Sequence, residues 1–476
     1  MFKKYQQIHF VGIGGIGMSG IAEVLINLGY RVTGSDLKVG DTIKRLRRLG
    51  AKIFLGHDRH HVAGAHVVVV SSAVPESNPE VREARRRGLS LVPRAEMLAE
   101  LMRLKYGVAV AGTHGKTSTT SLVGCILDWA GLDPTLIIGG KVNSLRSNAR
   151  LGRGDFLVAE ADESDRSFLK LAPTIGVITN IDPEHMENYR NFADMKRAFV
   201  EFANKVPFYG AVVACNAHPV VRGLLGKITR PCITYGGVGA DYEARDIKQK
   251  GERISFEVLH AGERMGRVEL RMTGSHQVLN ALAAISVGRH LDIPFGTIRA
   301  ALKGFSGVKR RFEVLTRAGP LVVDDYAHHP VEVAATISAA RCGWPGRRVV
   351  TVIQPHRYSR LAHHFDGFVC ALRDADAVVV MDVYPAGERP HRTYTGERLW
   401  KELCKRYPKR MAAFAPTGED VMTTLTPWCQ KEDVILFLGA GNVTQTARDL
   451  ARSLTCRRSM PGCAPASSAR RKRPRV

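Results

Sequence analysis

Residues 107–120 read GVAVAGTHGKTSTT, and this stretch places a short apolar strand directly before a glycine-rich loop and a helix. Backbone N–H groups in such a loop and the dipole of the following helix attract phosphate. Lys116 can reach the β- and γ-phosphates of ATP, and the Thr117 hydroxyl can bind Mg²⁺. Val110 stands where the standard phosphate-loop motif has its first glycine. The loop therefore favours ATP without the full motif, and helix capping by Thr113 and Thr117 is the alternative.

A second strand, glycine loop and helix occur at residues 7–20, QIHFVGIGGIGMSG. The loop satisfies the GxGxxG pattern, and Asp36 lies nineteen residues beyond Gly17, at the end of the next predicted strand. This spacing is typical of sites where glycines admit a diphosphate and the acid meets a sugar hydroxyl. The pattern predicts NAD or a nucleotide-sugar without distinguishing them, and a tight turn without a ligand is the alternative.

Strand-like and helical segments alternate along nearly the whole chain, which predicts α/β layers with mostly parallel sheets. The alternation falls into three blocks, predicted at 1–106, 107–315 and 316–456, followed by a disordered basic tail at 457–476. Helices are predicted at 94–102 and 117–130, and antiparallel edge strands within 254–270. The other predicted strands are 7–11, 30–33, 66–71, 107–111, 156–160, 175–179, 321–323, 349–353, 377–381 and 434–438.

The net charge is +24 over 476 residues, from 69 Lys and Arg against 45 Asp and Glu. Residues 457–476 hold seven basic residues and no acid, which leaves +17 on the remainder. A basic excess suits nucleic acid, anionic lipid or anionic small substrates. The hydrophobic share of 45% excludes wholesale disorder.

Neither a membrane span nor a disulfide framework is expected. The longest apolar runs, such as 66–70, are too short to cross a bilayer, and the N-terminus lacks the apolar stretch of a signal peptide. The nine cysteines are scattered without a CxxC pair, which is typical of reduced thiols in a cytoplasmic protein.

An acidic cluster follows the predicted strand 156–160, with carboxylates at positions 160, 162, 163 and 165. Such a cluster suits a hard divalent cation beside a triphosphate. A solvated acidic loop is the alternative, especially for Glu163 and Asp165. His185 follows another predicted strand, where it could meet a second metal or serve only a structural role.

The third block places polar loops after two buried-type strands, at Asp324-Asp325 and at Gln354–Arg360. Ligand-binding loops lie at such strand ends in α/β sheets, and arginine binds a carboxylate through its two-pronged guanidinium. A basic surface loop is the alternative.

Taken together, these motifs resemble the Mur ligases, and the resemblance extends from about residue 5 to residue 455. Arg166 and Gln277 depart from it, since a small residue and Asn are expected there. The matching segments are GIGGIGMSG (12–20), AGTHGKTSTT (111–120), EADESDRSFL (160–169), TNIDPEH (179–185), VKRRFE (308–313), DDYAHHP (324–330) and QPHRYSR (354–360).

The resemblance implies three domains: an N-terminal Rossmann-like domain for a UDP-sugar, a central P-loop-type ATPase domain with a mixed sheet, and a C-terminal Rossmann-like domain for an amino acid. It implies cytoplasmic synthesis of a peptidoglycan precursor by ATP-dependent amide formation. The γ-phosphate of ATP would pass to the lactyl carboxylate of UDP-N-acetylmuramate, and the amine of L-alanine would attack the acyl phosphate. ADP and phosphate would leave. A monomer and a homodimer both stay open, and neither a membrane nor a specific nucleic acid is an expected partner.

The resemblance also implies roles for individual residues. Catalytic roles fall to Lys116, His185 and Arg311. Mg²⁺ or Mn²⁺ would be held by Thr117, Glu160 and His185. The expected contacts with ATP are Gly112, Thr113, His114, Gly115, Lys116, Thr117, Ser118, Asn280, Arg311 and Asp325. Those with the UDP-sugar are Gly12, Gly14, Gly15, Gly17, Met18, Asp36 and Ser71, and those with the amino acid are His329, His356, Arg357 and Arg360.

Three other functions remain open from the sequence. Another ATP-dependent ligase of the same fold would differ only in substrate. An NAD-dependent oxidoreductase fits the first glycine loop and Asp36 but leaves Lys116 and the acidic cluster unexplained. A nucleic-acid-binding ATPase is suggested by the charge, and its affinity for DNA would fall steeply with salt.

Overall fold

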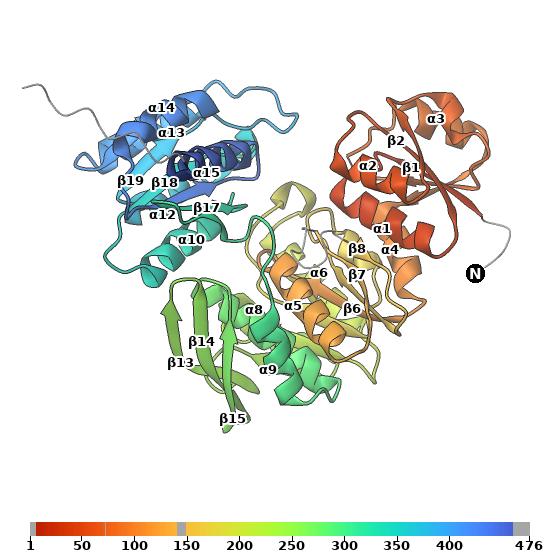
Figure 1. Ribbon diagram of the computed structural model, residues 1–476. Coiled ribbons are helices and arrows are strands. Elements are labelled where there is room, and N and C mark those ends of the chain that lie inside the picture. Colours follow the sequence, from red (N-terminus) through yellow and green to blue (C-terminus); the bar gives the residue numbers. More distant parts are fainter. Residues whose placement is uncertain (1–5, 72, 140–148, 460–476) are drawn as a thin grey trace, which may run out of the picture. The chain divides into compact units, whose positions relative to one another are not determined.

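The computed structural model describes residues 6–71, 73–139 and 149–459, and the chain divides into two compact units. Met1–Lys309 forms the first unit and Arg310–Val476 the second. The first unit contains two sheets and the second contains one (Figure 1).

The first sheet has five parallel strands in the order β3-β2-β1-β4-β5. Helices α1 and α2 cover one face, and α3 packs on the other. Its strands are β1 (Gln7–Val11), β2 (Arg31–Asp36), β3 (Lys52–Leu55), β4 (Val67–Val70) and β5 (Ser90–Pro93). Its helices are α1 (Ile16–Asn27), α2 (Asp41–Arg48), α3 (Pro79–Arg86) and α4 (Arg94–Met102), with a 3₁₀ turn at Arg59–Val62.

The central sheet has ten strands in the order β15-β14-β13-β12-β11-β10-β6-β9-β7-β8. Within this sheet, the three strands that come last in the sequence, β13 to β15, form antiparallel hairpins at one edge, next to α8 and α9 (Figure 1). The strands are β6 (Tyr106–Ala111), β7 (Thr135–Ile137), β8 (Ala149–Arg150), β9 (Phe156–Glu160), β10 (Ile175–Ile178), β11 (Ala211–Cys215), β12 (Cys232–Tyr235), β13 (Tyr242–Lys250), β14 (Arg253–His260) and β15 (Glu263–Leu270).

Two apolar layers cover the central sheet. Helices α5, α8 and α9 bury one face, while α6 lies on the other. The second layer is continuous with the core beneath α1 and α4, so the first two sheets belong to one unit. The helices are α5 (Lys116–Trp129), α6 (Phe192–Asn204), α7 (Pro219–Arg222), α8 (Ser275–His290) and α9 (Phe295–Gly304).

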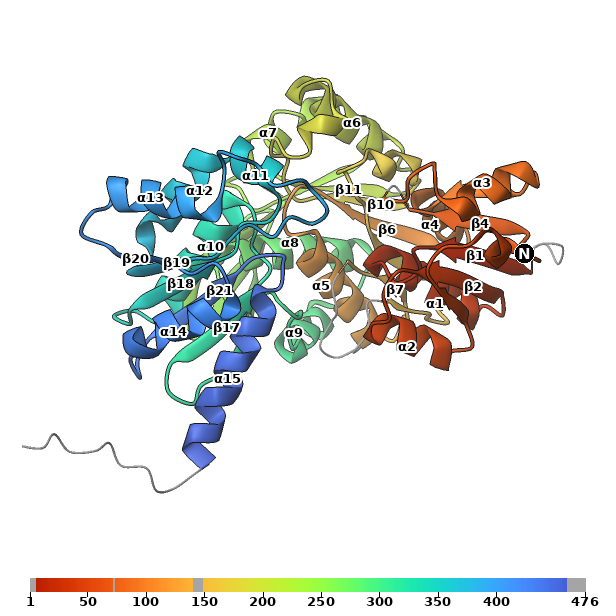
Figure 2. The same cartoon turned by 90° about the horizontal axis from the view of Figure 1, so that it is seen from above.

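The second unit is a six-stranded sheet in the order β16-β17-β21-β18-β19-β20, parallel except for β16. Helices α10 to α13 cover one face and α14 and α15 the other (Figure 2). The strands are β16 (Glu313–Thr316), β17 (Leu321–Asp325), β18 (Val349–Ile353), β19 (Ala377–Val380), β20 (Met411–Phe414) and β21 (Val434–Leu438). The helices are α10 (Pro330–Gly343), α11 (Tyr358–His363), α12 (Phe365–Ala371), α13 (Gly396–Arg406), α14 (Gly418–Trp428) and α15 (Val443–Ser459).

The α/β class with mostly parallel sheets is confirmed, and the ten individually predicted strands all occur, with ends shifted by up to a few residues. Short strands such as β3 and β5 are additional, because they lie at the edges of the first sheet and carry little apolar pattern. The second unit begins at Arg310, and its first strand, β16, pairs with β17.

The predicted tail differs at its start, because α15 continues to Ser459. The rest of the tail, 460–476, lies outside the described residues. Among the described residues, every helix is too short or too polar to cross a membrane. The cysteines that the structure describes with their side chains are free thiols.

Candidate active site

The loop between β6 and α5 is held in shape by the strand end that lies beside it. The His114 amide donates to Asn180 Oδ1 at 2.7 Å, and the Asn180 side-chain amide donates back to the His114 carbonyl at 3.0 Å. Gly115 has φ +79°, and a Cβ there would lie 2.5 Å from Asn280 Oδ1. Only glycine fits this position without strain, so the loop is shaped before any ligand arrives.

Lys116, the first residue of α5, points back into this loop. Its ammonium donates to Glu163 Oε2 at 2.6 Å and to the carbonyls of Gly112 at 2.6 Å and Thr113 at 3.2 Å. Burial alone would lower the pKa of Lys116, but Glu163, Asp162 and a further carboxylate raise it. Burial raises the pKa of Glu163 to about 7, against the lowering effect of Lys116.

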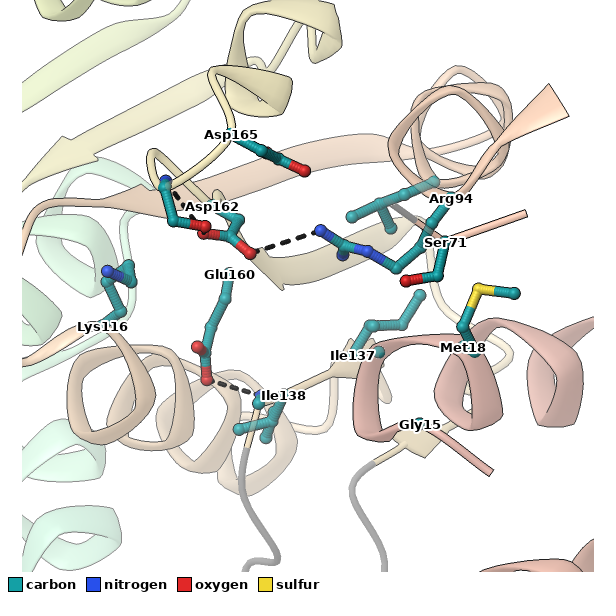
Figure 3. A pocket seen from close by; sticks show the side chains of 14 residues that line it. Gly15, Met18, Ser71, Arg94, Lys116, Ile137, Ile138, Glu160, Asp162 and Asp165 are labelled. Carbon is teal, nitrogen blue, oxygen red and sulfur yellow. Dashed lines mark hydrogen bonds and ion pairs between the residues drawn. The ribbon is translucent and has the colours of Figure 1, made fainter. Parts of the chain in front are cut away.

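A pocket of about 330 Å³ lies beside Lys116, within the first unit (Figure 3). On one side its walls come from the first glycine loop, α1, the end of β4 and α4. On the other side they come from the start of α5 and from the ends of β7 and β9 with the loops that follow them. It is therefore shared between the first and central sheets. The lining residues are Gly15, Gly17, Met18, Ser71, Arg94, Leu98, Lys116, Ile137, Ile138, Gly139, Glu160, Asp162, Ser164 and Asp165.

Carboxylates and one arginine form the polar part of this pocket. Arg94 reaches from α4 and donates to Asp162 Oδ2 at 3.3 Å, while Lys116 lies on the opposite side of the carboxylates (Figure 3). Glu160 Oε1 accepts the Gly139 amide at 2.6 Å. Burial would raise the pKa of Asp162, but Lys116, the Ser164 hydrogen bonds and Arg94 lower it overall. The pocket thus presents anions and cations side by side.

The first glycine loop is closed by Asp36. The Gly14 amide donates to Asp36 Oδ2 at 2.8 Å, and a Cβ on Gly14 would lie 2.7 Å from the same oxygen. Asp36 therefore supports the turn from behind, and it is not among the described residues that line the pocket.

In the second unit, Asp325 ends β17 and is buried. Its carboxylate accepts the Phe312 amide at 2.7 Å and the Ala327 amide at 2.8 Å. Burial raises the pKa of Asp325 to about 6, while Arg311 opposes the rise. The Arg311 guanidinium lies 5.4 Å from the centre of the Tyr326 ring. Asp325 and Arg311 thus sit in one neighbourhood of this unit.

A histidine and arginine group lies at the ends of β17 and β18. Arg360 Nη1 is 3.3 Å from His356 Nδ1, and the His356 ring centre is 5.9 Å from that of His328. Burial, together with Arg360 and Arg357, lowers the pKa of His356 to about 4. At neutral pH His356 is therefore uncharged, and the positive charge of the group belongs to the arginines.

His329 has a structural position in the same region. It is the N-cap of α10, where its Nδ1 accepts the Val331 amide at 3.4 Å and Glu332 completes a capping box. Its ring also lies 4.5 Å from the ring of His364.

Three Mur ligase family models match consecutive parts of the chain. The "Mur ligase family, catalytic domain" covers residues 7–106, the "Mur ligase middle domain" 110–288, and the "Mur ligase, glutamate ligase domain" 310–441. The chain belongs to the Mur ligase family.

Individual relatives of this Mur ligase share most of their length with it. A protein of Geobacter sp. strain M21 named UDP-N-acetylmuramate–L-alanine ligase is 52% identical, over 94% of this chain and 98% of its own. A protein of Syntrophotalea carbinolica with the same name is 52% identical over 95% and 99%. The crystal structure of UDP-N-acetylmuramate-alanine ligase MurC from Thermotoga maritima has a TM-score of 0.82 at 29% identity, covering 95% of this chain and 99% of that one.

The pocket of this Mur ligase brings together residues predicted for two ligands. From the predicted UDP-sugar set it contains Gly15, Gly17, Met18 and Ser71, and from the predicted nucleotide and metal sets Lys116 and Glu160. Other predicted residues of the same unit are not among the described lining residues: Gly12, Gly14, Asp36, Gly112, Thr113, His114, Gly115, Thr117, Ser118, His185 and Asn280. The roles of all these residues stay predictions.

Sequence reasoning missed Arg94 as a site residue and left Glu163 undecided. In the sequence Arg94 is only the first residue of the predicted helix 94–102, and nothing local marks it as a partner of Asp162. The solvated alternative for Glu163 is wrong, because its side chain is 1% exposed and pairs with Lys116. A buried lysine needs a counter-charge, which is the signal that could have singled out Glu163.

Proposed function

We propose that this Mur ligase joins L-alanine to the lactyl carboxylate of UDP-N-acetylmuramate, with ATP converted to ADP and phosphate. The observation that carries the proposal is the shared pocket, where the first glycine loop and Met18 face Lys116 and Glu160. Such a pocket suits a reaction between a nucleotide-sugar and a triphosphate. The names and near-complete coverage of the relatives support the choice of substrates.

The first step would transfer the γ-phosphoryl group of ATP to a lactyl carboxylate oxygen, giving an acyl phosphate and ADP. Two anions must approach each other, so positive charge has to offset their repulsion. Lys116 supplies such a charge at the start of α5, where the first backbone amides of the helix would face the phosphate chain. Arg94, on the sugar side of the pocket, is suited to hold the carboxylate.

Oxygen ligands in this pocket fit a divalent cation such as Mg²⁺ or Mn²⁺. Glu160 offers a carboxylate on the pocket wall, and hard cations of this kind prefer carboxylate oxygens. Thr117 and His185 are the further candidates from the sequence. When bound, the cation would neutralise charge on the phosphates.

The second step would be attack of the L-alanine amine on the acyl carbon, which forms the amide and releases phosphate. Arg357 and Arg360 of the second unit would hold the alanine carboxylate, because both stay charged while His356 is neutral. His329 would contribute less, since its Nδ1 caps α10. Arg311 and Asp325 would contact ATP.

One assay tests the proposal: phosphate release from ATP with UDP-N-acetylmuramate, with L-alanine present or withheld. We expect release to depend on both substrates. Release that does not need L-alanine, or that is faster with glycine or D-alanine, would contradict this assignment and favour another ligase of the same fold. Binding of NADH without binding of ATP would favour the oxidoreductase instead.

Two further proposals follow from this function. The product would be a peptidoglycan precursor made in the cytoplasm. The basic excess of the chain would serve anionic substrates rather than a specific nucleic acid. Size-exclusion chromatography with light scattering would distinguish a monomer from a homodimer.

A further inference from the structure

We propose that Glu163 is a positioning residue for Lys116, whose ammonium it holds in the nucleotide-free protein by taking the place of a phosphate group. The inference rests on the proposed binding of ATP at the loop between β6 and α5. In this role Glu163 acts through Lys116 and binds neither a metal ion nor the substrate.

The hydrogen bonds of Lys116 support this assignment. An ammonium group has three N–H donors, and Lys116 has three acceptors within reach: Glu163 Oε2 at 2.6 Å, the Gly112 carbonyl at 2.6 Å and the Thr113 carbonyl at 3.2 Å. Glu163 is the only one of these three acceptors that can ionise, since the other two are backbone carbonyls. A phosphate that binds Lys116 must therefore replace the Glu163 carboxylate.

The backbone of Glu163 is fixed, so its carboxylate has a defined position. The Tyr189 hydroxyl donates to the Glu163 carbonyl at 2.6 Å, and the Arg166 amide donates to the same carbonyl at 3.1 Å. The Glu163 side chain is 1% exposed, against 18% for Lys116. A carboxylate that is buried and held this way competes with a ligand more strongly than a mobile one at the surface.

The neighbouring carboxylate serves a different cation. Asp162 accepts from Arg94 at 3.3 Å, whereas Glu163 accepts from Lys116. Two adjacent acids thus hold one cation on the sugar side and one on the phosphate side. Because charges of like sign repel strongly at short range away from water, Glu163 also opposes a phosphate chain near Lys116. Its presence should weaken nucleotide binding and so ease the release of ADP.

Isothermal titration calorimetry of the full chain with ATP and with ADP, each with Mg²⁺, tests this role through Glu163→Gln. A hydrogen bond to a charged group contributes about 1.5–3 kcal/mol, so removing the competing carboxylate should lower the Kd for ATP by about tenfold or more. The KM for ATP should fall, and kcat should fall as well if slower ADP release limits turnover. A role in folding alone would lower stability without tightening binding.

Asp165→Asn is the matched control, because Asp165 lies two residues further along the same loop and its substitution removes the same charge. Its carboxylate accepts the Ser167 amide at 3.0 Å, and no ion pair of Asp165 is found among the described residues. We expect a clearly smaller change in the Kd for ATP than in Glu163→Gln. An equal change in both variants would overturn the proposal, since the general charge of the pocket would then explain it.

A thermal-unfolding series separates folding from binding. Without nucleotide, Glu163→Gln should melt below the wild type, because Lys116 is left buried without its counter-charge. Saturating Mg²⁺–ATP should raise its melting temperature by more than that of the wild type. If the Gln variant does not fold, Glu163→Asp, which withdraws the carboxylate by one methylene, should still bind ATP more tightly than the wild type.

Unchanged or weaker ATP binding in a folded Glu163 variant would overturn the inference and leave the proposed function intact. Failure of the wild type to bind ATP at all would instead overturn the proposed function, and the inference with it.

Discussion

Replacing Glu80 by Gln should destabilise the first sheet by about 3 kcal/mol at neutral pH. Glu80 lies on α3 with a fully buried side chain. Its Oε2 accepts the Ser35 hydroxyl at 2.6 Å, and its Oε1 is 2.7 Å from His61 Nδ1. His57 and His9 approach the same carboxylate at 3.3 and 3.6 Å. The glutamate thus joins α3 to β1, β2 and the turn after β3.

The magnitude follows from the pKa of Glu80. Burial would raise it, but hydrogen bonds from His9, Ser35 and His61 outweigh burial and lower the pKa from 4.5 to about 2. One pKa unit corresponds to about 1.4 kcal/mol, which gives the estimate of about 3 kcal/mol. Because the folded-state pKa is depressed, this stability is complete above pH 4.5 and is lost as the pH falls toward 2.

Hydrogen–deuterium exchange of the full chain along a urea series measures this effect, with peptides that cover β1 and β2. The free energy of unfolding of this sheet should be about 3 kcal/mol lower in Glu80→Gln than in the wild type at pH 7.5. At pH 4 this difference should be smaller by about 1 kcal/mol. The control is Glu83→Gln on the same helix. Glu83 pairs with Arg86 and Arg87, which are exposed enough for solvent to screen them, so its loss should be clearly smaller. A difference below about 0.5 kcal/mol for Glu80→Gln at pH 7.5, or one that does not change with pH, would refute the reasoning.

Three further variants test the proposed site. Lys116→Ala should reduce acyl-phosphate formation by at least about a hundredfold, measured by trapping with hydroxylamine, because a charge beside the transferred group is lost; near-normal turnover would remove Lys116 from the mechanism. Arg360→Ala should raise the KM for L-alanine by roughly tenfold and that for ATP much less, whereas equal rises would indicate a folding defect. Gly115→Ala should weaken ATP binding in calorimetry, because its φ of +79° strains any L side chain by about 1–2 kcal/mol and Asn280 occupies the space; unchanged affinity would show that the loop can relax.

Local sequence was sufficient to predict the two glycine loops. Each follows an apolar strand and opens a helix, and both occur as predicted at the ends of β1 and β6. Glycine positions and β-branched runs report local backbone geometry, so they can be interpreted without the rest of the chain. The short strands β3 and β5 were not predicted, because four residues at a sheet edge leave too weak a pattern.

Local sequence could not predict which charges pair. The acidic cluster after β9 suits a metal, a solvated loop or an ion pair equally well. In the folded chain Glu163 pairs with Lys116, which lies 47 residues away in sequence. Asp162 pairs with Arg94, which lies 68 residues away.

The sequence by itself determined that this chain is an α/β protein with two glycine loops between strand and helix and a resemblance to the Mur ligases, because strand, loop and helix signals are local. Only the tertiary structure decided how those parts meet. Strands β6 and β9 pair in parallel with Val110 opposite Glu160, so the loops that follow them open at the same edge of the sheet. That register brings Lys116 to Glu163, and the packing of α4 against the 3₁₀ turn at Ser167–Lys170 brings Arg94 to Asp162. Distances between residues far apart in sequence depend on strand register and helix packing, which no single segment encodes.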